Sequence, residues 1–461
     1  MTLFYTKDVF KISVKSYISI ISSKLVLKLS KALFKGGTNF PGKVALKLDK
    51  DILKTIAKDY KVIMVTGTNG KTTTTSMIYN MLKDSGKKVI TNNTGANMLP
   101  GIVSCFIEHY KFNEVNNGEK YAVIETDEAN VPLVTKFISP EIITVTNLFR
   151  DQLDRYGEVY TTLKKILEGI EKVPFAALVL NGDESLLGDL PLPNRTVYYG
   201  FNCPVDENNK IDVNADSKFC KKCKSPYKYN FLTYNHLGDF YCENCGYKRP
   251  KLNYTLDEIN ELTPEGSHVI IDSQKCYINQ PGIYNIYNAL CAYAIGRELK
   301  INKSTIIDSL KRQKSSFGRQ EELNIDGKQV KIILVKNPAG YDQAINTITL
   351  DKRNINIAVL LNDNYADGRD VSWLWDVKFE KLALMDIDKI MVAGIRLYDM
   401  AVRLKVAGLS YENFSLCENY DTLLEEIKSC KSGVIYVLAT YTAMIDFRKY
   451  LHSKNYIEKL W

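Results

Sequence analysis

The sequence predicts an α/β protein built on parallel sheets, with a small metal-binding insertion. Three observations indicate this. A strand-like run passes through a glycine loop into a helical pattern at 61–82, further apolar runs end in polar residues, and two Cys-x-x-Cys pairs lie in a segment without apolar periodicity. Strands that alternate with helices are typical of parallel sheets, because each parallel connection needs a crossover. With 461 residues, two to four domains are expected.

The overall composition excludes several classes of protein. Apolar residues make up 45% and charged residues 25% of the chain, as in globular proteins, so a disordered or fibrous protein is excluded. The net charge of +8 is a mild excess, which leaves an anionic substrate or membrane surface open. No run of 18 apolar residues occurs, so a spanning helix is not expected.

The N-terminal stretch from Val9 to Leu33 is apolar but interrupted by lysines. It has no unbroken apolar region and no small-residue cleavage site, so it does not resemble a signal peptide. Four lysines fall at helical spacing on one face: Lys24, Lys28, Lys31 and Lys35. A surface helix packed on its own domain is the favoured interpretation, and a membrane-interface helix is the alternative.

The central strands and helices follow from apolar runs. Residues 61–65 form a strand, the helix after the loop extends through Leu82, and residues 87–91 close a βαβ unit. Three more buried strands are expected at 121–125, 142–146 and 177–181. Their polar ends lie where ligands bind in open α/β sheets.

The rest of the chain predicts an insertion and a second α/β domain. Residues 202–251 are rich in Lys, Asn, Tyr and Cys and form the insertion, and a helix is expected at 284–299. Phe317-Gly318-Arg319 marks a linker before strands at 331–335, 355–361, 389–392 and 434–438. The predicted units are an N-terminal helical segment (1–50), a central nucleotide-binding domain (51–316) and a C-terminal domain (317–461).

The glycine loop is the strongest catalytic signal. It consists of Gly67, Thr68, Asn69, Gly70, Lys71, Thr72 and Thr73. Glycines let backbone N–H groups approach phosphate oxygens at the positive end of the following helix. The Lys71 ammonium suits the β- and γ-phosphates, and the Thr72 hydroxyl suits Mg²⁺. Val65 occupies the place of the first glycine of a standard Walker A motif.

Two polar clusters follow strands. Glu125, Asp127 and Glu128 stand at one strand end, and we select Glu125 as a Mg²⁺ ligand, with a solvated turn as the alternative. The second cluster is Asn147-Leu-Phe-Arg-Asp151-Gln-Leu-Asp154. It could order a water or a metal, or cap the next helix.

The cysteines indicate a structural zinc site in a reducing compartment. Cys220, Cys223, Cys242 and Cys245 form two Cys-x-x-Cys pairs, a spacing typical of zinc ribbons with no open metal position. His236, between the pairs, is expected to be a surface residue. The other six cysteines are scattered and expected to be small buried hydrophobes: Cys105, Cys203, Cys276, Cys291, Cys417 and Cys430.

Together these motifs resemble the Mur ligases, ATP-dependent amide-forming enzymes of peptidoglycan synthesis that are related to folylpolyglutamate synthases. The resemblance covers residues 40–461. It rests on the motifs Gly-Thr-Asn-Gly-Lys-Thr-Thr at 67–73, Thr-Asn-Leu-Phe-Arg-Asp-Gln-Leu-Asp at 146–154, Asn285-Ile-Tyr-Asn288-Ala-Leu and Phe317-Gly-Arg319-x-Glu321. It implies a central P-loop ATPase domain with the zinc ribbon inserted, and a Rossmann-like C-terminal domain.

Within that family the chain resembles the MurT group, the ligase subunits that amidate the D-glutamate of lipid II. The resemblance rests on the four-cysteine insertion and on residues 336–340, 362–375 and 440–444. It implies ATP phosphates on Lys71, Mg²⁺ on Thr72 and Glu125, adenine at Asn288 and phosphates at Arg319.

This chain departs from the family pattern at three places. Gln152 stands where many members carry a metal-binding His, so the number of Mg²⁺ ions stays open. Lys164 aligns only loosely with a lysine that is carbamylated in several members. Residues 336–340 replace the signature that contacts an amino-acid substrate, which favours another nucleophile.

The MurT resemblance also implies a partner, a GatD-like glutaminase subunit that forms a heterodimer with this chain and supplies ammonia. An aspartate of this chain would complete the partner's triad. By position it is Asp370, with Asp367 and Asp376 as competitors and a loop carboxylate without a catalytic role as the alternative. Trp373 and Trp375 alternate along the chain and are expected on one side of an extended segment, packed in the core or at the partner interface.

The predicted reaction activates a carboxylate of lipid II as an acyl phosphate, which ammonia then converts to an amide. The expected location is cytoplasmic, with the inner face of the membrane left open, and no nucleic-acid partner is expected. Three alternatives stay open: a Mur or folylpolyglutamate ligase that adds an amino acid alone, a zinc-ribbon nucleic-acid-binding NTPase, and a non-catalytic scaffold.

Overall fold

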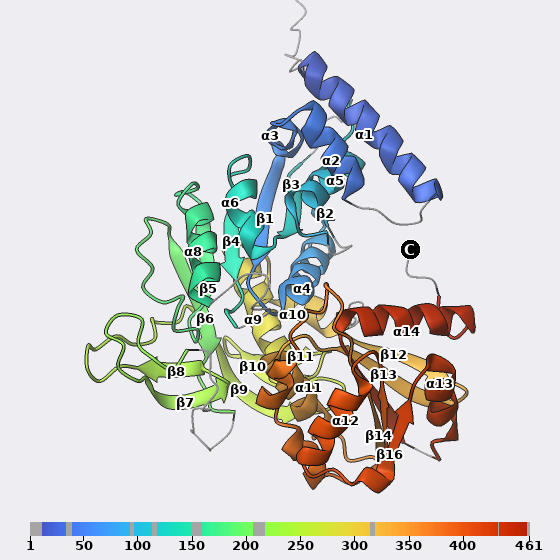
Figure 1. Ribbon diagram of the computed structural model, residues 1–461. Coiled ribbons are helices and arrows are strands. Elements are labelled where there is room, and N and C mark those ends of the chain that lie inside the picture. Colours follow the sequence, from blue (N-terminus) through green and yellow to red (C-terminus); the bar gives the residue numbers. More distant parts are fainter. Residues whose placement is uncertain are drawn as a thin grey trace, which may run out of the picture.

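The computed structural model describes residues 12–33, 39–92, 96–112, 118–149, 159–205, 217–313, 319–431 and 433–458. Two large sheets and one separate hairpin organise this part of the chain (Figure 1). The predicted α/β class is confirmed, because both large sheets are mainly parallel and are flanked by helices.

The central sheet has nine strands in the order β11-β10-β9-β6-β5-β4-β1-β3-β2. The neighbouring strands in the part of this order from β9 through β6, β5, β4, β1 and β3 to β2 all pair in parallel. At the other edge, β10 pairs antiparallel with both β9 and β11. The bounds are β1 (Tyr60–Thr66), β2 (Lys88–Thr91), β3 (Lys120–Glu125), β4 (Ile142–Val145), β5 (Ala177–Asn181), β6 (Thr196–Phe201), β9 (Tyr254–Leu262), β10 (Ser267–Ile271) and β11 (Gln274–Ile278). The five strands predicted for the central domain are confirmed.

Helices cover both faces of this sheet, which explains why its central strands are apolar without interruption. Along β1, Ile63 and Val65 face one core, and Val62 and Met64 face the other. The first core includes α4 (Lys71–Asp84), α9 (Ile283–Glu298) and α10 (Lys303–Arg312). The second includes α3 (Ile52–Ala57), α5 (Leu99–His109), α6 (Val131–Val134) and α8 (Val159–Ile170). The phosphate loop between β1 and α4 therefore sits on a rigid scaffold.

The N-terminal helices stack on the second face. α1 (Val14–Leu33) packs on α2 (Phe40–Leu48), and α2 packs on α5. Figure 1 shows α1 on the outside of this layer, at the opposite end of the molecule from β14 and β16. Among the described helices, none combines the length and apolar content needed to span a bilayer.

The C-terminal sheet has six strands in the order β12-β13-β17-β14-β15-β16, with only the β12–β13 pair antiparallel. The bounds are β12 (Arg319–Ile325), β13 (Lys328–Leu334), β14 (Ile355–Leu360), β15 (Ile387–Ala393), β16 (Phe414–Cys417) and β17 (Val434–Ala439). Its helices are α11 (Pro338–Ile348), α12 (Leu397–Val406), α13 (Tyr420–Ser429) and α14 (Tyr441–Ser453). Short 3₁₀ helices are η1 (Glu128–Asn130), η2 (Ser372–Asp376), η3 (Phe379–Leu384) and η4 (Tyr411–Asn413). The four predicted strands are confirmed, and the edge strands β12 and β16 are additions.

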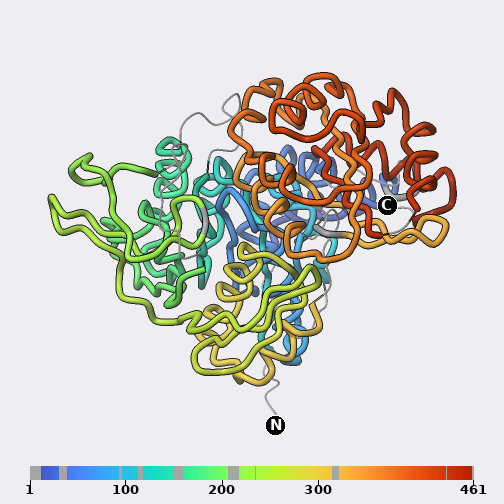
Figure 2. Tube along the Cα trace, turned by 90° about the horizontal axis from the view of Figure 1, so that it is seen from below, coloured from blue at the N-terminus to red at the C-terminus, as the bar shows by residue number. Residues whose placement is uncertain are grey.

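The four-cysteine insertion forms the hairpin of β7 (Lys228–Tyr234) and β8 (Leu237–Tyr241). Figure 2 shows it projecting from the side of the central sheet, away from the C-terminal part. Its own small core contains Cys220, Tyr227, Phe240, Cys242 and Tyr247. This core is too small to stand alone, so contacts with the rest of the chain and the cysteine cluster are expected to contribute to its stability.

Candidate active site

The phosphate loop has two glycines that no other residue can replace without strain. Gly67 has φ +118° and Gly70 has φ +85°, the left-handed region that disfavours a side chain. A Cβ at Gly67 would lie 2.4 Å from Thr146 Oγ1, and one at Gly70 would lie 2.2 Å from Asn288 Oδ1. The loop is therefore drawn tightly against β4 and α9 while α4 begins at Lys71.

Lys71 is buried at the first position of α4. Its Nζ donates to Gly67 O at 2.5 Å and to Glu128 Oε1 at 2.8 Å. Burial raises the pKa of the Glu128 carboxyl, and the adjacent Lys71 ammonium opposes that rise. Glu128, which follows the end of β3, is therefore the ion-pair partner of the loop lysine. Apart from the acidic cluster at 125–128, no sequence pattern indicated this pairing.

The segment after β4 holds the phosphate loop in place. Thr146 Oγ1 donates to Asn69 O at 2.6 Å, and Asn69 N donates to Asn147 Oδ1 at 2.9 Å. Thr68 Oγ1 donates to Phe149 O and accepts from Phe149 N, both at 3.1 Å. The first part of the 146–154 motif thus fixes the backbone of the loop, a role that its sequence alone left open.

The C-terminal part of the chain reaches this loop directly. Lys336 Nζ donates to Thr68 O at 3.4 Å, and Asn337 Nδ2 donates to Asn69 Oδ1 at 3.3 Å. Asn337 also caps α11, because its side chain accepts from Gly340 N at 2.8 Å. The two parallel-sheet regions therefore meet at the phosphate loop.

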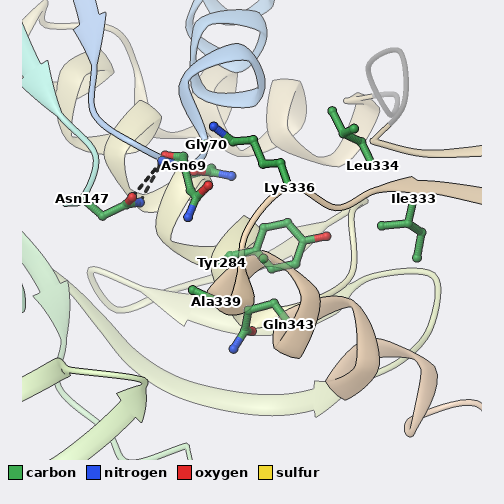
Figure 3. Close-up of a pocket in the computed structure, with 11 residues that line it drawn as sticks. Asn69, Gly70, Asn147, Tyr284, Ile333, Leu334, Lys336, Ala339 and Gln343 are labelled. Atoms are coloured by element: carbon green, nitrogen blue, oxygen red, sulfur yellow. Dashed lines mark hydrogen bonds between the residues drawn. The ribbon is translucent and has the colours of Figure 1, made fainter. Parts of the chain in front are cut away.

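A pocket opens between these two regions. It holds about 660 Å³, including space open to solvent, and its lining residues are Asn69, Gly70, Asn147, Tyr284, Asn288, Ile333, Leu334, Lys336, Ala339, Gly340 and Gln343. Figure 3 shows the Lys336 side chain lying beside Gly70 and Asn69, with Tyr284 and Gln343 on the other side. A mostly apolar cleft with a few converging polar groups suits a small-molecule ligand.

Asn288 joins the pocket to the phosphate loop. Its Oδ1 accepts from Thr74 Oγ1 at 3.2 Å, and its Nδ2 donates to Asn285 Oδ1 at 3.1 Å. Because α9 packs along α4, the predicted nucleotide-binding asparagine lies next to Gly70.

Glu125 is buried at the end of β3. Asn97 Nδ2 donates to its Oε1 at 3.1 Å, and Asn92 Oδ1 accepts from its backbone N at 2.9 Å. β3 lies beside β1 in parallel, with Glu125 paired to Val65. Its carboxylate and the partly buried Thr72 hydroxyl supply oxygen donors, the ligand type that Mg²⁺ requires.

Some predicted site residues are not among the residues that the structure describes. Residues 150–158, including Gln152, and the residues Phe317 and Gly318 are not among those described. Arg319 begins β12, but its side chain is likewise outside the description. Lys164 is exposed on α8.

The four predicted zinc ligands come together. The sulfurs of Cys220, Cys223, Cys242 and Cys245 all lie within 4.8 Å of one another. Each pair forms a tight turn, in which Lys224 N donates to Cys220 O and Gly246 N donates to Cys242 O. Four converging thiol sulfurs match the donor set of a closed tetrahedral metal site.

The prediction of a surface position for His236 is wrong. His236 is fully buried, and its Nε2 lies 2.8 Å from Oε2 of the equally buried Glu184. The same Glu184 oxygen accepts from Leu148 N at 3.2 Å, and the His236 ring lies 4.8 Å from that of Phe149. The tip of the hairpin therefore packs against the segment that holds Thr68. A lone histidine between two cysteine pairs carries no local signal for so distant a contact.

Replacing His236 with alanine is expected to lower the free energy of unfolding by about 2–4 kcal/mol. The change leaves the buried Glu184 carboxylate short of a partner and opens a cavity beside Phe149. Chemical denaturation of the full chain measures this loss. His268→Ala is the matched control, because His268 is exposed and lies 4.0 Å from Glu261. An equal, small effect in both variants would contradict the expectation.

Other contacts fasten the hairpin to the segment after β5. Tyr247 Oη donates to Ser185 O at 2.7 Å, and Arg249 donates to Asp183 Oδ1 at 3.0 Å. Tyr287, next to Asn288 on α9, donates to Asp183 Oδ2 at 2.6 Å. The cysteine hairpin is thus joined to both elements that hold the phosphate loop.

The three candidate aspartates differ in exposure. Asp370 is exposed, and hydrogen bonding to Ser372, whose N lies 2.8 Å from its Oδ1, lowers the pKa of Asp370. Asp367 is buried and accepts from Thr442 N at 2.7 Å, and burial raises the pKa of Asp367. Asp376 is partly buried. The exposed Asp370 is therefore the most accessible of the three.

The expected extended segment around the tryptophans is wrong. Ser372–Asp376 form the 3₁₀ helix η2, so Trp373 and Trp375 do not share one side of a strand. Trp373 packs at the edge of the C-terminal core, 6.2 Å from the Tyr341 ring, and Trp375 is 56% exposed. Residues two apart lie on different faces of a 3₁₀ helix, which has three residues per turn, and an alternation over only four residues did not separate a strand from this short helix.

The expectation that the six scattered cysteines are small buried residues is confirmed for five of them. Cys203 is partly buried, and the others are buried: Cys105, Cys276, Cys291, Cys417 and Cys430. Burial raises the pKa of Cys105 to about 12, which makes it inert as a nucleophile.

Two parts of the chain match known protein families. Residues 65–247 match the Mur ligase middle domain, and residues 334–444 match the MurT ligase C-terminal family. The lipid II isoglutaminyl synthase (glutamine-hydrolyzing) subunit MurT of Streptococcus pneumoniae is 42% identical over 92% of this chain and 94% of its own length. The subunit of the same name from Staphylococcus aureus is 36% identical over 85% of this chain and 88% of its own.

Solved structures show the same fold at lower identity. A pseudomurein peptide ligase type C from Methanothermus fervidus matches with TM-score 0.67 and 22% identity, over 88% of this chain and 81% of that one. MurF from Thermotoga maritima in complex with ADP matches with TM-score 0.61 and 14% identity, over 89% and 85%. The fold, the phosphate loop, the cysteine cluster and the extent of identity lead to one conclusion: the chain belongs to the MurT family of Mur ligases.

Proposed function

We propose that this chain is the ligase subunit of a lipid II isoglutaminyl synthase. It uses ATP to convert the α-carboxylate of the D-glutamate of lipid II to the amide, which gives D-isoglutamine, ADP and phosphate. The observation that carries this proposal is 42% identity over nearly the full length to a subunit named for that reaction. The phosphate loop, reached by Lys336 and Asn337 from the C-terminal part, supports it.

ATP would be bound by residues of the pocket together with residues around the phosphate loop. Lys71 and the N-terminal amides of α4 would hold the β- and γ-phosphates, and Arg319 would approach them from β12. Asn288 would contact the adenine. Thr72 and Glu125 would hold Mg²⁺, which offsets the negative charge of the phosphates.

The reaction has two steps. A carboxylate oxygen of D-glutamate attacks the γ-phosphorus, the bond from that phosphorus to the β-phosphate oxygen breaks, and ADP leaves. Ammonia then attacks the carbonyl carbon of the acyl phosphate, the carbon–oxygen bond to phosphate breaks, and the nitrogen gives up a proton. Lys71 stabilises the charge that develops on the transferring oxygens.

The nitrogen comes from a second protein, because ammonia at neutral pH is mostly ammonium, which has no free electron pair. We propose a GatD-like glutaminase that forms a heterodimer with this chain. Both relatives are named as subunits, which supports the presence of a partner protein. Asp370 is the residue we assign to the partner's triad, where an aspartate orients the histidine.

The surface near Asp370 suits such a partner. Exposed aromatic and aliphatic side chains gather on η2 and α12, which pack together. They are Trp375, Tyr398, Val402 and Val406, and Tyr365 is also exposed, five residues before Asp370. Arg403 lies over the Trp375 ring, 5.5 Å from its centre. Exposed aromatic anchors beside an arginine are typical of binding hot spots.

The cysteine cluster is proposed to hold one structural zinc ion. We expect about one zinc per purified chain, a content that Cys242→Ser abolishes and Cys203→Ser leaves intact. Loss of zinc should also weaken ATP binding, because the hairpin packs on the segment that holds Thr68. Metal analysis and ATP titration check this. Full zinc content in Cys242→Ser would contradict the assignment.

The proposed location is the cytoplasm, with peripheral contact at the inner face of the plasma membrane, because the proposed substrate is a lipid.

The function is tested by mixing the purified chain with its partner subunit, lipid II, ATP and glutamine. We expect D-isoglutamine only when all components are present, and high ammonium should replace glutamine and partner. ATP turnover that requires an amino acid and ignores the partner would support an amino-acid ligase instead. Salt-sensitive binding to DNA or RNA would indicate the nucleic-acid alternative.

A further inference from the structure

Helix α1 is oriented with its apolar side toward solvent. Six large side chains on one face are between 43% and 76% exposed: Val14, Tyr17, Ile18, Ile21, Leu25 and Leu29. Their spacing of three and four residues places them on one continuous stripe. A stripe of this kind on a soluble surface usually marks an interaction site.

The opposite side of α1 packs on the protein through serines. The side chains of Ser16, Ser19 and Ser23 are buried, with Ile20 between them. Ser16 Oγ donates to Asp49 Oδ2 at 2.6 Å, and Ser19 Oγ donates to Ala45 O at 3.0 Å. The helix is therefore fixed on α2 through small polar residues. The apolar stripe contributes little to this packing. Packing within the chain therefore does not explain why these positions of α1 are apolar.

The positive charge of the chain is concentrated in this region. The first 50 residues contain ten lysines, no arginine, two aspartates and no glutamate, a net charge of +8. This equals the net charge of the whole chain, so the remaining residues are neutral overall. α1 itself contains four lysines and no acidic residue.

Lysines border the apolar stripe. Lys15 and Lys28 are exposed on α1, and Lys111 is exposed in the segment after α5. Burial and the charges of Lys28 and Lys111 lower the pKa of Lys24, against the opposing charge of Glu108. Close to these lysines the Phe112 ring, also exposed, lies 5.0 Å from that of Tyr17 and widens the apolar area.

We propose that α1 lies flat on an anionic lipid surface, with its stripe in the acyl boundary and its lysines at the headgroups. An apolar stripe bordered by lysines is the pattern of interfacial helices, and each lysine near an anionic leaflet adds attraction. The bordering charge favours lipid over a protein partner, whose contact surfaces are depleted in lysine. The proposal rests on the proposed function in one respect: a lipid-linked substrate would explain why this chain binds a membrane.

Vesicle sedimentation of the full chain, alone and with its partner subunit, tests the proposal. We expect binding to vesicles of equal parts phosphatidylglycerol and phosphatidylcholine, weak binding to phosphatidylcholine alone, and loss of binding as salt rises. Ile21→Glu with Leu25→Glu should weaken binding by about 10-fold or more, because both residues lie at the centre of the stripe.

The matched control is Leu133→Glu with Phe175→Glu. These residues are exposed and apolar but lie elsewhere, and the change in charge is the same. We expect vesicle binding within about 2-fold of the wild type, because surface changes away from a binding site have small effects. Equal loss in both double variants, or no binding by the wild type, would overturn the proposal. Loss of partner binding by the α1 variant with vesicle binding intact would assign the stripe to a protein and also overturn it.

An activity assay separates this proposal from the proposed function. The α1 variant should amidate a water-soluble short-chain lipid II at the wild-type rate and vesicle-embedded lipid II more slowly. If neither the wild type nor the α1 variant amidates either substrate, the proposed function fails. The vesicle result still decides whether α1 binds lipid.

Discussion

Replacing Lys71 with methionine is expected to lower ATP-dependent amidation by about 10²–10³-fold, the effect of removing one charge that stabilises a transition state. Lys71 is the cation at the start of α4, within 2.5 Å of Gly67 O and 2.8 Å of Glu128. Methionine has a similar unbranched side chain, one heavy atom shorter, without the charge. The measurement is the rate of product formation at saturating ATP in the presence of ammonium, which bypasses the partner.

Two further variants make this result interpretable. Lys71→Met leaves Glu128 buried without its ammonium, which could unfold the chain, so Lys71→Met with Glu128→Gln restores a neutral pair. Lys83→Met is the matched control, because Lys83 is exposed on the same helix. We expect a folded double variant without activity and an active Lys83 variant. A folded Lys71 variant with activity within about 10-fold of the wild type would remove the phosphate loop from the mechanism.

Asp370→Asn is expected to lower the glutaminase activity of the complex by about 10⁴-fold, the effect of replacing the aspartate that orients a catalytic histidine. The asparagine is isosteric and exposed, so the fold should not change. The measurement is glutamate release from glutamine by the complex. Amidation with added ammonium should stay at the wild-type rate, because the ligase site is elsewhere.

Asp376→Asn is the matched control for Asp370→Asn. Both aspartates flank the short segment that contains Ser372, but only Asp370 is exposed. Normal glutaminase activity in the Asp370 variant with loss in the Asp376 variant would transfer the role to Asp376. Loss of ammonium-dependent amidation in the Asp370 variant would instead show a defect in the ligase itself.

The fold was predictable where local pattern and final environment agree. Buried parallel strands such as β1 and β3 are short apolar runs, because helices cover both faces of the sheet. Two of the strands missed in the sequence, β12 and β16, lie at sheet edges, where the apolar pattern is weak, whereas β6, β9 and β10 were missed although they lie inside the nine-stranded sheet. The insertion was predicted from its cysteine pairs, but its strands β7 and β8 were not. Their core is small and includes two of the cysteines, so the segment shows little apolar periodicity.

The candidate site was predictable as a set of motifs but not as a set of contacts. The glycine loop and the cysteine pairs were found from residue type and spacing, and Asn288 from the resemblance to Mur ligases. The structure brings the four cysteines together and places Asn288 next to Gly70. The acidic cluster with Glu128 was expected near the loop, but the pairing of Glu128 with Lys71 and the contact of Lys336 with Thr68 were missed, because they join residues 57 and 268 positions apart. The buried His236–Glu184 contact is of the same kind, since no local pattern encodes a contact across 52 positions.

One isotope experiment tests the central claim most directly. The complex would receive lipid II with ¹⁸O in the D-glutamate α-carboxylate, glutamine with ¹⁵N in its amide, and ATP, and mass spectrometry would follow both labels. Carboxylate activation by ATP predicts one ¹⁸O in the released phosphate and ¹⁵N in the D-isoglutamine. Phosphate without ¹⁸O, or product without ¹⁵N, would contradict the account.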